Sequence, residues 1–407
     1  MEPVVEGLID KPKLEEEKNK NKIEEKKKEK EEDEKEEEEE EKEEEEKEEE
    51  GKEEGNKILI KDEEDIKEIK TLKDLEKIKS DWDRVEIYDL NFQNIFEKLK
   101  NIKFEHLEIF SLNNVEINSL DFLLNDNFKF LVILELKNSS LKNLNNISRV
   151  FSTELKVLDL SFNEISAIDE ISNAPFKDLE ILILSNNKIK DIKPIPDGLF
   201  TKLKKLDMSN NQIESIKSLG DNETLKNLES LYLNENTISD ISVLKCEIFK
   251  NLKELQLNNN QIEKINDLEN AQFTELLELM LFGNKIKFID PLSRAKFEKL
   301  KILNLGKNQI ENIDSLYKSS FKNLEKLNFF DNKILSVEVL KDIPFKNIQE
   351  LDLSFNSLKS INIFLTEKFP KLTSLKFEGN KNLNYSDKNI QTVYETFKIK
   401  YTFNSIL

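Results

Sequence analysis

The sequence predicts an α/β solenoid: a curved right-handed horseshoe with a parallel β-sheet on its concave face and short helical or irregular segments on its convex face. Three observations favour this class. An asparagine recurs every 24 residues except for one step of 25, a leucine pattern recurs in phase with it, and a phenylalanine precedes most of the new turns. Such a period indicates stacked units that cannot bury their apolar faces alone.

The recurring asparagines are predicted to form a structural ladder. An Asn amide carries two donors and an acceptor, so it can pair with main-chain groups of adjacent turns that burial would otherwise leave without a partner. Leucine at this position could not do so. The ladder consists of Asn163, Asn187, Asn211, Asn236, Asn260, Asn284, Asn308, Asn332, Asn356 and Asn380.

The leucines around each asparagine predict a short strand. In the turn that begins at Leu155, the pattern is Leu155-x-x-Leu158-x-Leu160-x-x-Asn163. Side chains alternate along a strand, so Leu158 and Leu160 point into the core and the residues between them face the concave side. Twelve such turns begin at Leu107, and a degenerate one precedes them, which gives thirteen parallel strands.

A second ladder of phenylalanines predicts a stacked aromatic spine. Burial of one ring contributes about 1.5 to 3 kcal/mol, and ring contacts add to this. Leu225 replaces Phe in the 25-residue repeat, beside Gly220, where we expect a local bulge. The ladder consists of Phe104, Phe128, Phe176, Phe200, Phe249, Phe273, Phe297, Phe321, Phe345 and Phe369.

The full pattern, L-x-x-L-x-L-x-x-N-x-I-x-x-I-x-x-L, resembles the leucine-rich repeat family over about three quarters of the chain. Within that family it is most similar to the intracellular class typified by a regulatory subunit of type-one protein phosphatase. The isoleucines after the asparagine, and Pro194 or Pro291 after them, carry this likeness. The resemblance implies a non-catalytic scaffold, a regulatory subunit that binds partner proteins in its concave groove.

The sequence divides into four segments. Residues 1–56 form a Glu/Lys-rich acidic tail that is disordered or a single helix, residues 57–106 a helical cap and degenerate first repeat, residues 107–383 twelve repeats, and residues 384–407 a C-terminal cap helix begun by Ser386. The cap helices are inferred from apolar spacing. The N-terminal set is Ile66, Ile69, Leu72, Leu75 and Ile78, and the C-terminal set is Ile390, Val393, Tyr394 and Phe397.

The acidic tail leaves two interpretations open. Residues 31–50 contain 17 acidic residues and three lysines, a charge of −14 out of −20 for the chain. Such a run stays solvated. It is a solubilising spacer, or it makes the protein a binder or chaperone of basic proteins, similar in kind to acidic leucine-rich nuclear phosphoproteins.

Composition argues against several other functions. His106 and Cys246 have no partners at catalytic spacing, and we expect no enzyme activity, cofactor or metal. The single cysteine and the absence of a signal-like or membrane-spanning run favour the cytoplasm, with the nucleus as the other location. We also expect a monomer. The concave positions are too acidic for nucleic acid. Their acids are Glu135, Asp159, Asp207, Glu254, Glu278, Glu350, Asp352 and Glu378, and their lysines are Lys137, Lys205, Lys326 and Lys376.

Four large side chains are the candidate anchors for a partner on the concave face: Tyr232, Met280, Phe282 and Phe330. Exposed aromatic and Met side chains on a rigid surface are common hot spots of protein interfaces. The alternative is that each is an isolated surface residue. A second row is interpreted as structural, because β-branched neighbours on adjacent strands pack on one another. This row consists of Ile109, Ile133, Val157 and Ile181.

Overall fold

The computed structural model of the protein describes residues 68–69, 78–89, 95, 99, 102–343, 345–366 and 368–397. The chain divides into two compact units, Met1–Asp65 and Ile66–Leu407, and every described residue belongs to the second. The predicted acidic tail at residues 1–56 therefore lies outside the described residues.

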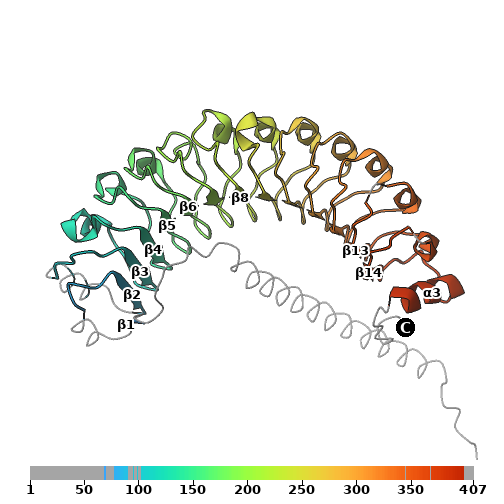
Figure 1. Cartoon of the computed structure of the whole chain (residues 1–407), viewed down its shortest axis with the longest axis horizontal. Coiled ribbons are helices and arrows are strands. Elements are labelled where there is room, and N and C mark those ends of the chain that lie inside the picture. Colours follow the sequence, from blue (N-terminus) through green and yellow to red (C-terminus); the bar gives the residue numbers. More distant parts are fainter. Residues whose placement is uncertain are drawn as a thin grey trace, which may run out of the picture. The chain divides into compact units, whose positions relative to one another are not determined.

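A single parallel sheet organises the second unit. Its described residues form 14 strands in chain order, and each strand pairs with the next (Figure 1). The predicted α/β solenoid is confirmed. The strands are β1 (Glu68–Ile69), β2 (Arg84–Tyr88), β3 (Ile109–Asn113), β4 (Ile133–Lys137), β5 (Val157–Asp159), β6 (Ile181–Ile183), β7 (Lys205–Asp207), β8 (Ser230–Tyr232), β9 (Glu254–Gln256), β10 (Glu278–Met280), β11 (Ile302–Asn304), β12 (Lys326–Asn328), β13 (Glu350–Asp352) and β14 (Ser374–Lys376).

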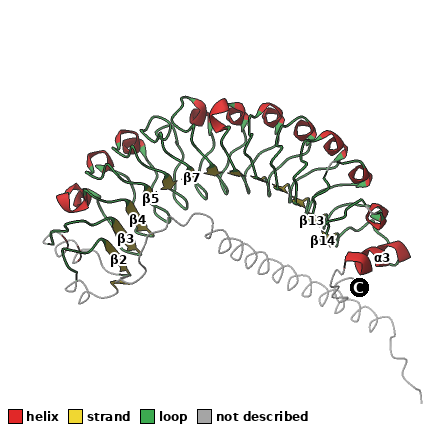
Figure 2. Cartoon of the chain, viewed as in Figure 1, coloured by secondary structure: helices red, strands yellow, loops and turns green. Residues whose placement is uncertain are grey.

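Short 3₁₀ helices occupy the outer side of the curved stack, opposite the strands (Figure 2). Of the run Ile165, Ile168 and Ile171 that follows Asn163, only Ile171 lies in a 3₁₀ helix, where it is buried in the core. The helices are η4 (Asp121–Leu124), η5 (Asp126–Phe128), η6 (Ile147–Arg149), η7 (Asp169–Asn173), η8 (Lys217–Gly220), η9 (Ser242–Lys245), η10 (Glu247–Phe249), η11 (Asn266–Asn270), η12 (Asp290–Ser293), η13 (Asp314–Lys318), η14 (Glu338–Lys341) and η15 (Asn362–Leu365).

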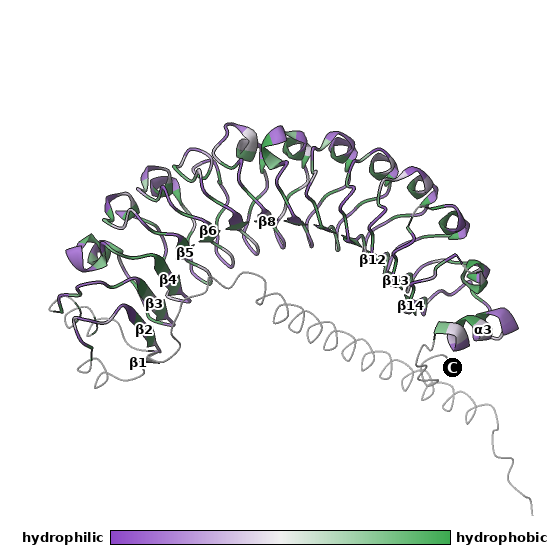
Figure 3. Ribbon diagram, in the orientation of Figure 1, coloured by the Kyte–Doolittle hydropathy of each residue, from purple (hydrophilic) through white to green (hydrophobic). Residues whose placement is uncertain are grey.

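The core lies between the strands and the 3₁₀ helices. Each short strand buries its central leucine, and parallel register places these leucines in one column, as for Leu255, Leu279 and Leu303. Along every turn, hydrophobic and hydrophilic residues alternate (Figure 3). Because each turn buries its apolar side chains against both neighbours, the core is continuous along the stack.

The asparagine ladder lies inside the turns. Nδ2 of Asn260 donates to the carbonyl oxygens of Leu233, Leu257 and Asn258 at 2.9, 3.1 and 3.1 Å, and its Oδ1 accepts from the amide of Ile238 at 3.0 Å. Leu233 and Ile238 belong to the preceding turn. One side chain therefore joins two turns, and the other ladder asparagines make corresponding bonds.

The phenylalanine ladder is also buried. Ring centroids of successive rungs lie 5.5 Å apart for Phe273 and Phe297 and 6.2 Å apart for Phe297 and Phe321. Leu225 is fully buried in its place within the 25-residue repeat. There the longer connection after η8 is fixed by Asn222, whose Nδ2 donates to the carbonyl oxygen of Pro196 at 2.8 Å.

The N-terminal cap differs from the sequence prediction. A helix was expected through Ile69, but Glu68–Ile69 is strand β1, with Ile69 opposite Ile87 of β2. The helix prediction is wrong at these residues. An uncovered β2 would present unpaired main-chain N–H and C=O groups, and one more strand satisfies them directly. Residues 66–67 and 70–77 of the expected helix lie outside the described residues, and Ile78 at its end is buried but not helical.

At the other end, helix α3 (Lys388–Phe397) covers the last turn and buries Ile390 and Val393. Its amphipathic spacing matches the expected cap helix, of which residues 398–407 lie outside the described part. Asp387 rather than Ser386 caps the helix, because its Oδ1 accepts from the amide of Asn389 at 2.8 Å.

Candidate functional site

The four candidate anchors differ in exposure. Tyr232, Phe282 and Phe330 are partly exposed on the concave side of the sheet, as their strand positions require. Met280 is only 7% exposed, so its interpretation as an exposed anchor is wrong. Its register partners on either side are Gln256 and Asn304, and side chains in one row of a parallel sheet cover one another.

Tyr232 belongs to a polar cluster at the middle of the concave face. Its hydroxyl donates to the Glu254 carboxylate, and Nζ of Lys205 lies 4.7 Å from its ring centroid. Burial, and then the Glu254 carboxylate, raise the pKa of the Tyr232 hydroxyl. Asp207 lies opposite Tyr232 in register. We name Lys205, Asp207, Tyr232 and Glu254 the central cluster.

A patch of aromatic rings lies toward the C-terminal end of the concave face. Phe330 and Phe355 make an edge-on contact with centroids 5.3 Å apart. The ring of Phe282 lies over Gly306, because a Cβ atom on Gly306 would be only 2.8 Å from Cδ2 of Phe282. Phe355 covers Gly379 in the same way, at 2.7 Å. We name Phe282, Phe330 and Phe355 the aromatic patch.

Sequence reasoning missed Phe355, which is 38% exposed. It stands immediately before the ladder residue Asn356, in a left-handed conformation with φ of 51°. Most other turns carry a small or polar residue at this position, as at Asn259 and Gly283, because Asn and Gly tolerate positive φ, and Phe162 is the one other ring there among the described turns. A bulky ring there was the signal that could have identified it.

A second apolar region lies toward the N-terminal end of the same face. Ile133, Val157 and Ile181 are register partners on β4, β5 and β6, and all three are partly exposed. They pack side by side, as the structural interpretation of this row expects, and Ile183 extends the group along β6. We name Ile133, Val157, Ile181 and Ile183 the aliphatic patch.

Burial destabilises the charged form of Asp352 on the concave face. Burial raises the pKa of Asp352 above the usual 3.8, although a hydrogen bond from the Ser354 amide and the charge of Lys376 act to lower that pKa. The folded protein thus holds this proton more tightly than the unfolded chain does. The resulting contribution to stability is fully present below pH 3.8 and declines as pH rises through the raised pKa.

We therefore expect Asp352→Asn to raise the thermal unfolding midpoint at pH 7 and to leave it unchanged below about pH 3.8. The neighbouring Asn328 shows that an amide fits, since its Oδ1 accepts from the Phe330 amide at 2.7 Å. Asp240→Asn is the opposite control, because hydrogen bonds from Ser242 lower the pKa of Asp240 and its carboxylate stabilises the fold at pH 7. A lower midpoint for Asp352→Asn at pH 7 would contradict the assignment.

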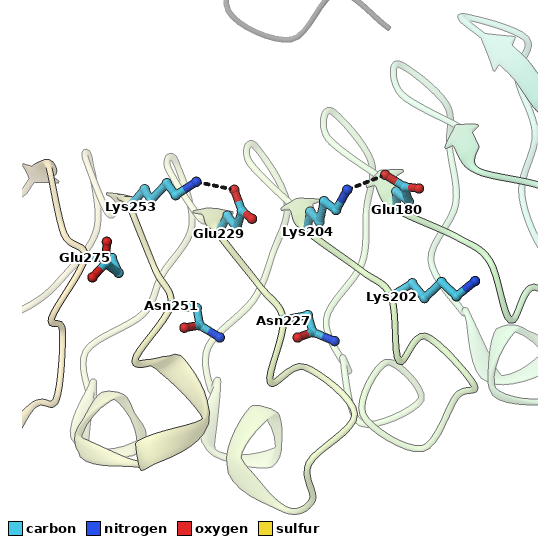
Figure 4. Close-up of a pocket in the computed structure, with 8 residues that line it drawn as sticks. All are labelled: Glu180, Lys202, Lys204, Asn227, Glu229, Asn251, Lys253 and Glu275. Carbon is cyan, nitrogen blue, oxygen red and sulfur yellow. Dashed lines mark hydrogen bonds and ion pairs between the residues drawn. The ribbon is translucent and has the colours of Figure 1, made fainter.

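The lateral side of the stack carries a shallow groove of about 480 Å³, drawn in Figure 4. Its charges pair with one another across turns: Lys204 with Glu180 and Lys253 with Glu229, each at 2.7 Å. Exposed pairs of this kind contribute roughly 0 to 1 kcal/mol each. The groove thus presents mutually satisfied charges rather than a set aimed at a ligand.

His106 and Cys246, which were considered for catalysis, pack against apolar neighbours. The His106 ring lies 5.6 Å from that of Phe130, and Cys246 packs against the core beside η9. Among the described residues, no group of three or more His, Cys, Asp or Glu side chains could hold a metal ion. No helix within the described ranges is long and apolar enough to cross a membrane.

The repeat region matches a family of known proteins. A family model described as leucine-rich repeats (two copies) matches residues 153–197, 177–221, 201–246, 226–270 and 274–318. The stacked parallel strands and buried asparagines thus define a solenoid of the leucine-rich repeat class. Residues 153–270 and 274–318 of this chain thus match the leucine-rich repeat family model. No curated protein matches the chain in sequence.

Solved structures share the fold. An internalin from Listeria monocytogenes is 23% identical with a TM-score of 0.60, covering 78% of this chain and 89% of its own. A leucine-rich repeat protein from Leptospira interrogans is 23% identical with a TM-score of 0.57, covering 77% and 88%. The plant peptide hormone receptor RGFR1, solved in complex with RGF2, is 21% identical with a TM-score of 0.52, covering 69% and 48%. At these identities the likeness concerns the fold alone.

Proposed function

We propose that this protein is a non-catalytic scaffold that binds one or more partner proteins through the concave face of its repeats. The observation that carries the proposal is the aromatic patch. Three rings lie partly exposed on one face of a hydrogen-bonded sheet, and two of them rest on glycines. Leucine-rich repeat proteins generally act as interaction scaffolds.

The rigidity of the platform supports this function. Asn258 and Asn328 accept hydrogen bonds from the amides of Phe282 and Phe330, so both anchors stand on a fixed backbone. Anchors that are already ordered lose little conformational entropy when a partner binds. The resemblance to phosphatase regulators favours a regulatory subunit, and the single cysteine favours a reducing compartment, the cytoplasm or nucleus. The protein is proposed to be a monomer.

The test is the double variant Phe282→Ala/Phe330→Ala. Its thermal midpoint should change little, because surface substitutions alter stability by about 1 kcal/mol or less. Its affinity for a protein captured from the source cell should fall by about 30-fold, equal to about 2 kcal/mol, if these rings are the anchors. Affinity is measured by calorimetry with the identified partner.

The matched control is Phe288→Ala/Tyr317→Ala. These rings are 73% and 49% exposed but lie away from the concave strands, so binding should persist. A partner that both double variants retain would contradict the concave site. If that partner is lost on deletion of residues 1–55 and released by salt, the acidic tract of residues 31–50 is the binding element instead.

A further inference from the structure

The concave face carries two apolar regions at opposite corners. The aliphatic patch lies on β4 to β6 at the early strand positions, whereas the aromatic patch lies beyond the ends of β10, β12 and β13. One row of register partners leads from the first region to the second. The row runs Ile183, Asp207, Tyr232, Gln256 and Met280, and Phe282 follows Met280 two residues further along the chain.

The distance between the two regions follows from this register. Four strand steps of about 4.8 Å separate Ile183 from Met280, and two further residues add about 7 Å along the strand direction. The diagonal is therefore about 20 Å. An extended chain at about 3.3 Å per residue covers this distance in six residues. Since six is even, side chains at both ends of such a segment project from the same side.

The row between the two regions is polar and acidic. In the central cluster, Asp207 and Glu254 outnumber Lys205, and strands β3 to β14 hold seven acids against four lysines. Burial raises the pKa of Asp207, because its carboxylate has lost much of its water. A cation brought by a partner would restore a favourable environment for that charge.

Resting on the proposed function, we propose that the partner presents an extended segment with two apolar side chains six residues apart and a lysine or arginine between them. One apolar side chain lies on the aliphatic patch and the other on the aromatic patch. The cationic side chain, at an even position between them, faces the central cluster. The combination of spacing and charge distinguishes this segment from other apolar peptides.

The experiment selects ligands from a displayed library of random 16-residue peptides, using the full chain as bait. Selected peptides are synthesised, and their affinity is measured by fluorescence anisotropy in 150 mM salt. We expect shared apolar residues six apart with Lys or Arg between them. Ile181→Ser/Ile183→Ser and Phe282→Ala/Phe330→Ala should each weaken binding at least tenfold, and Asp207→Asn at least threefold. Circular dichroism tests whether each variant folds. If Ile181→Ser/Ile183→Ser does not fold, the single variant Ile183→Ser is used in its place.

Any other outcome contradicts one particular element of the proposal. Peptides that respond to the Phe pair but not to the Ile pair exclude the two-region mode and leave the proposed function intact. Peptides that respond to neither pair contradict the concave site itself. Acidic selected peptides, or affinity unchanged by Asp207→Asn, exclude the cationic contact. Failure to select any peptide, with a captured protein still lost on Phe282→Ala/Phe330→Ala, excludes an extended segment in favour of a folded surface.

Discussion

Replacing Phe297 by alanine is expected to lower the free energy of unfolding by about 3 to 5 kcal/mol, the largest effect of any single substitution considered for this chain. Phe297 is fully buried and contacts the rings of both neighbouring turns, Phe273 and Phe321. Its removal leaves a cavity between three turns. Denaturant unfolding followed by circular dichroism measures the loss.

The matched control is Phe297→Leu, because the chain itself places Leu225 at the equivalent position. Leucine fills most of the cavity, so we expect a smaller loss of about 1 to 2 kcal/mol. A double-mutant cycle with Phe321→Ala isolates the ring contact, expected at about 0.5 to 1.5 kcal/mol. Equal losses for Phe297→Ala and Phe297→Leu would show that the rings do not form a packed spine.

The substitution Asn260→Leu is expected to cost about 3 kcal/mol, because it leaves one buried amide and three carbonyl groups without their side-chain partner. The affected amide belongs to Ile238 and the carbonyls to Leu233, Leu257 and Asn258. A solenoid turn contacts only its neighbours, so the loss should be local. Hydrogen exchange should therefore accelerate most in the turns on either side of residue 260.

The neighbouring Gln261 provides the control, since it is exposed and has nearly the same size as the ladder residue. Gln261→Leu should change stability by no more than about 0.5 kcal/mol. If Asn260→Leu unfolds at the same denaturant concentration as Gln261→Leu, the amide bonds do not stabilise the stack.

Much of the fold could be predicted from the sequence because each turn places the same residue types at the same positions, under the same packing and hydrogen-bonding requirements. Leucines two residues apart must face one side of a strand, and a buried asparagine must satisfy main-chain groups of its neighbours. The column of Leu255, Leu279 and Leu303 and the bonds of Asn260 follow from that repetition. The segment before the first repeat follows no such period, and there strand β1 lies at Glu68–Ile69 where a helix was expected.

The candidate site was predicted only in part, because exposure depends on neighbouring turns. Spacing placed Phe282 and Met280 on the concave side alike, yet Met280 is buried by its row neighbours whereas Phe282 lies over Gly306. Phe355 lies outside the strand pattern, and only its left-handed backbone directs it toward Phe330.

By itself, the sequence determined the period, the inward and outward faces of each strand and the solenoid class, because these depend on residue type at fixed spacing within a turn. The tertiary structure decided which outward side chains are exposed and which charges are buried, and it placed two apolar regions about 20 Å apart across an acidic middle. Those properties arise between turns. They depend on the register that brings Ile183, Asp207 and Tyr232 into one row, and hydrogen bonds between strands fix that register.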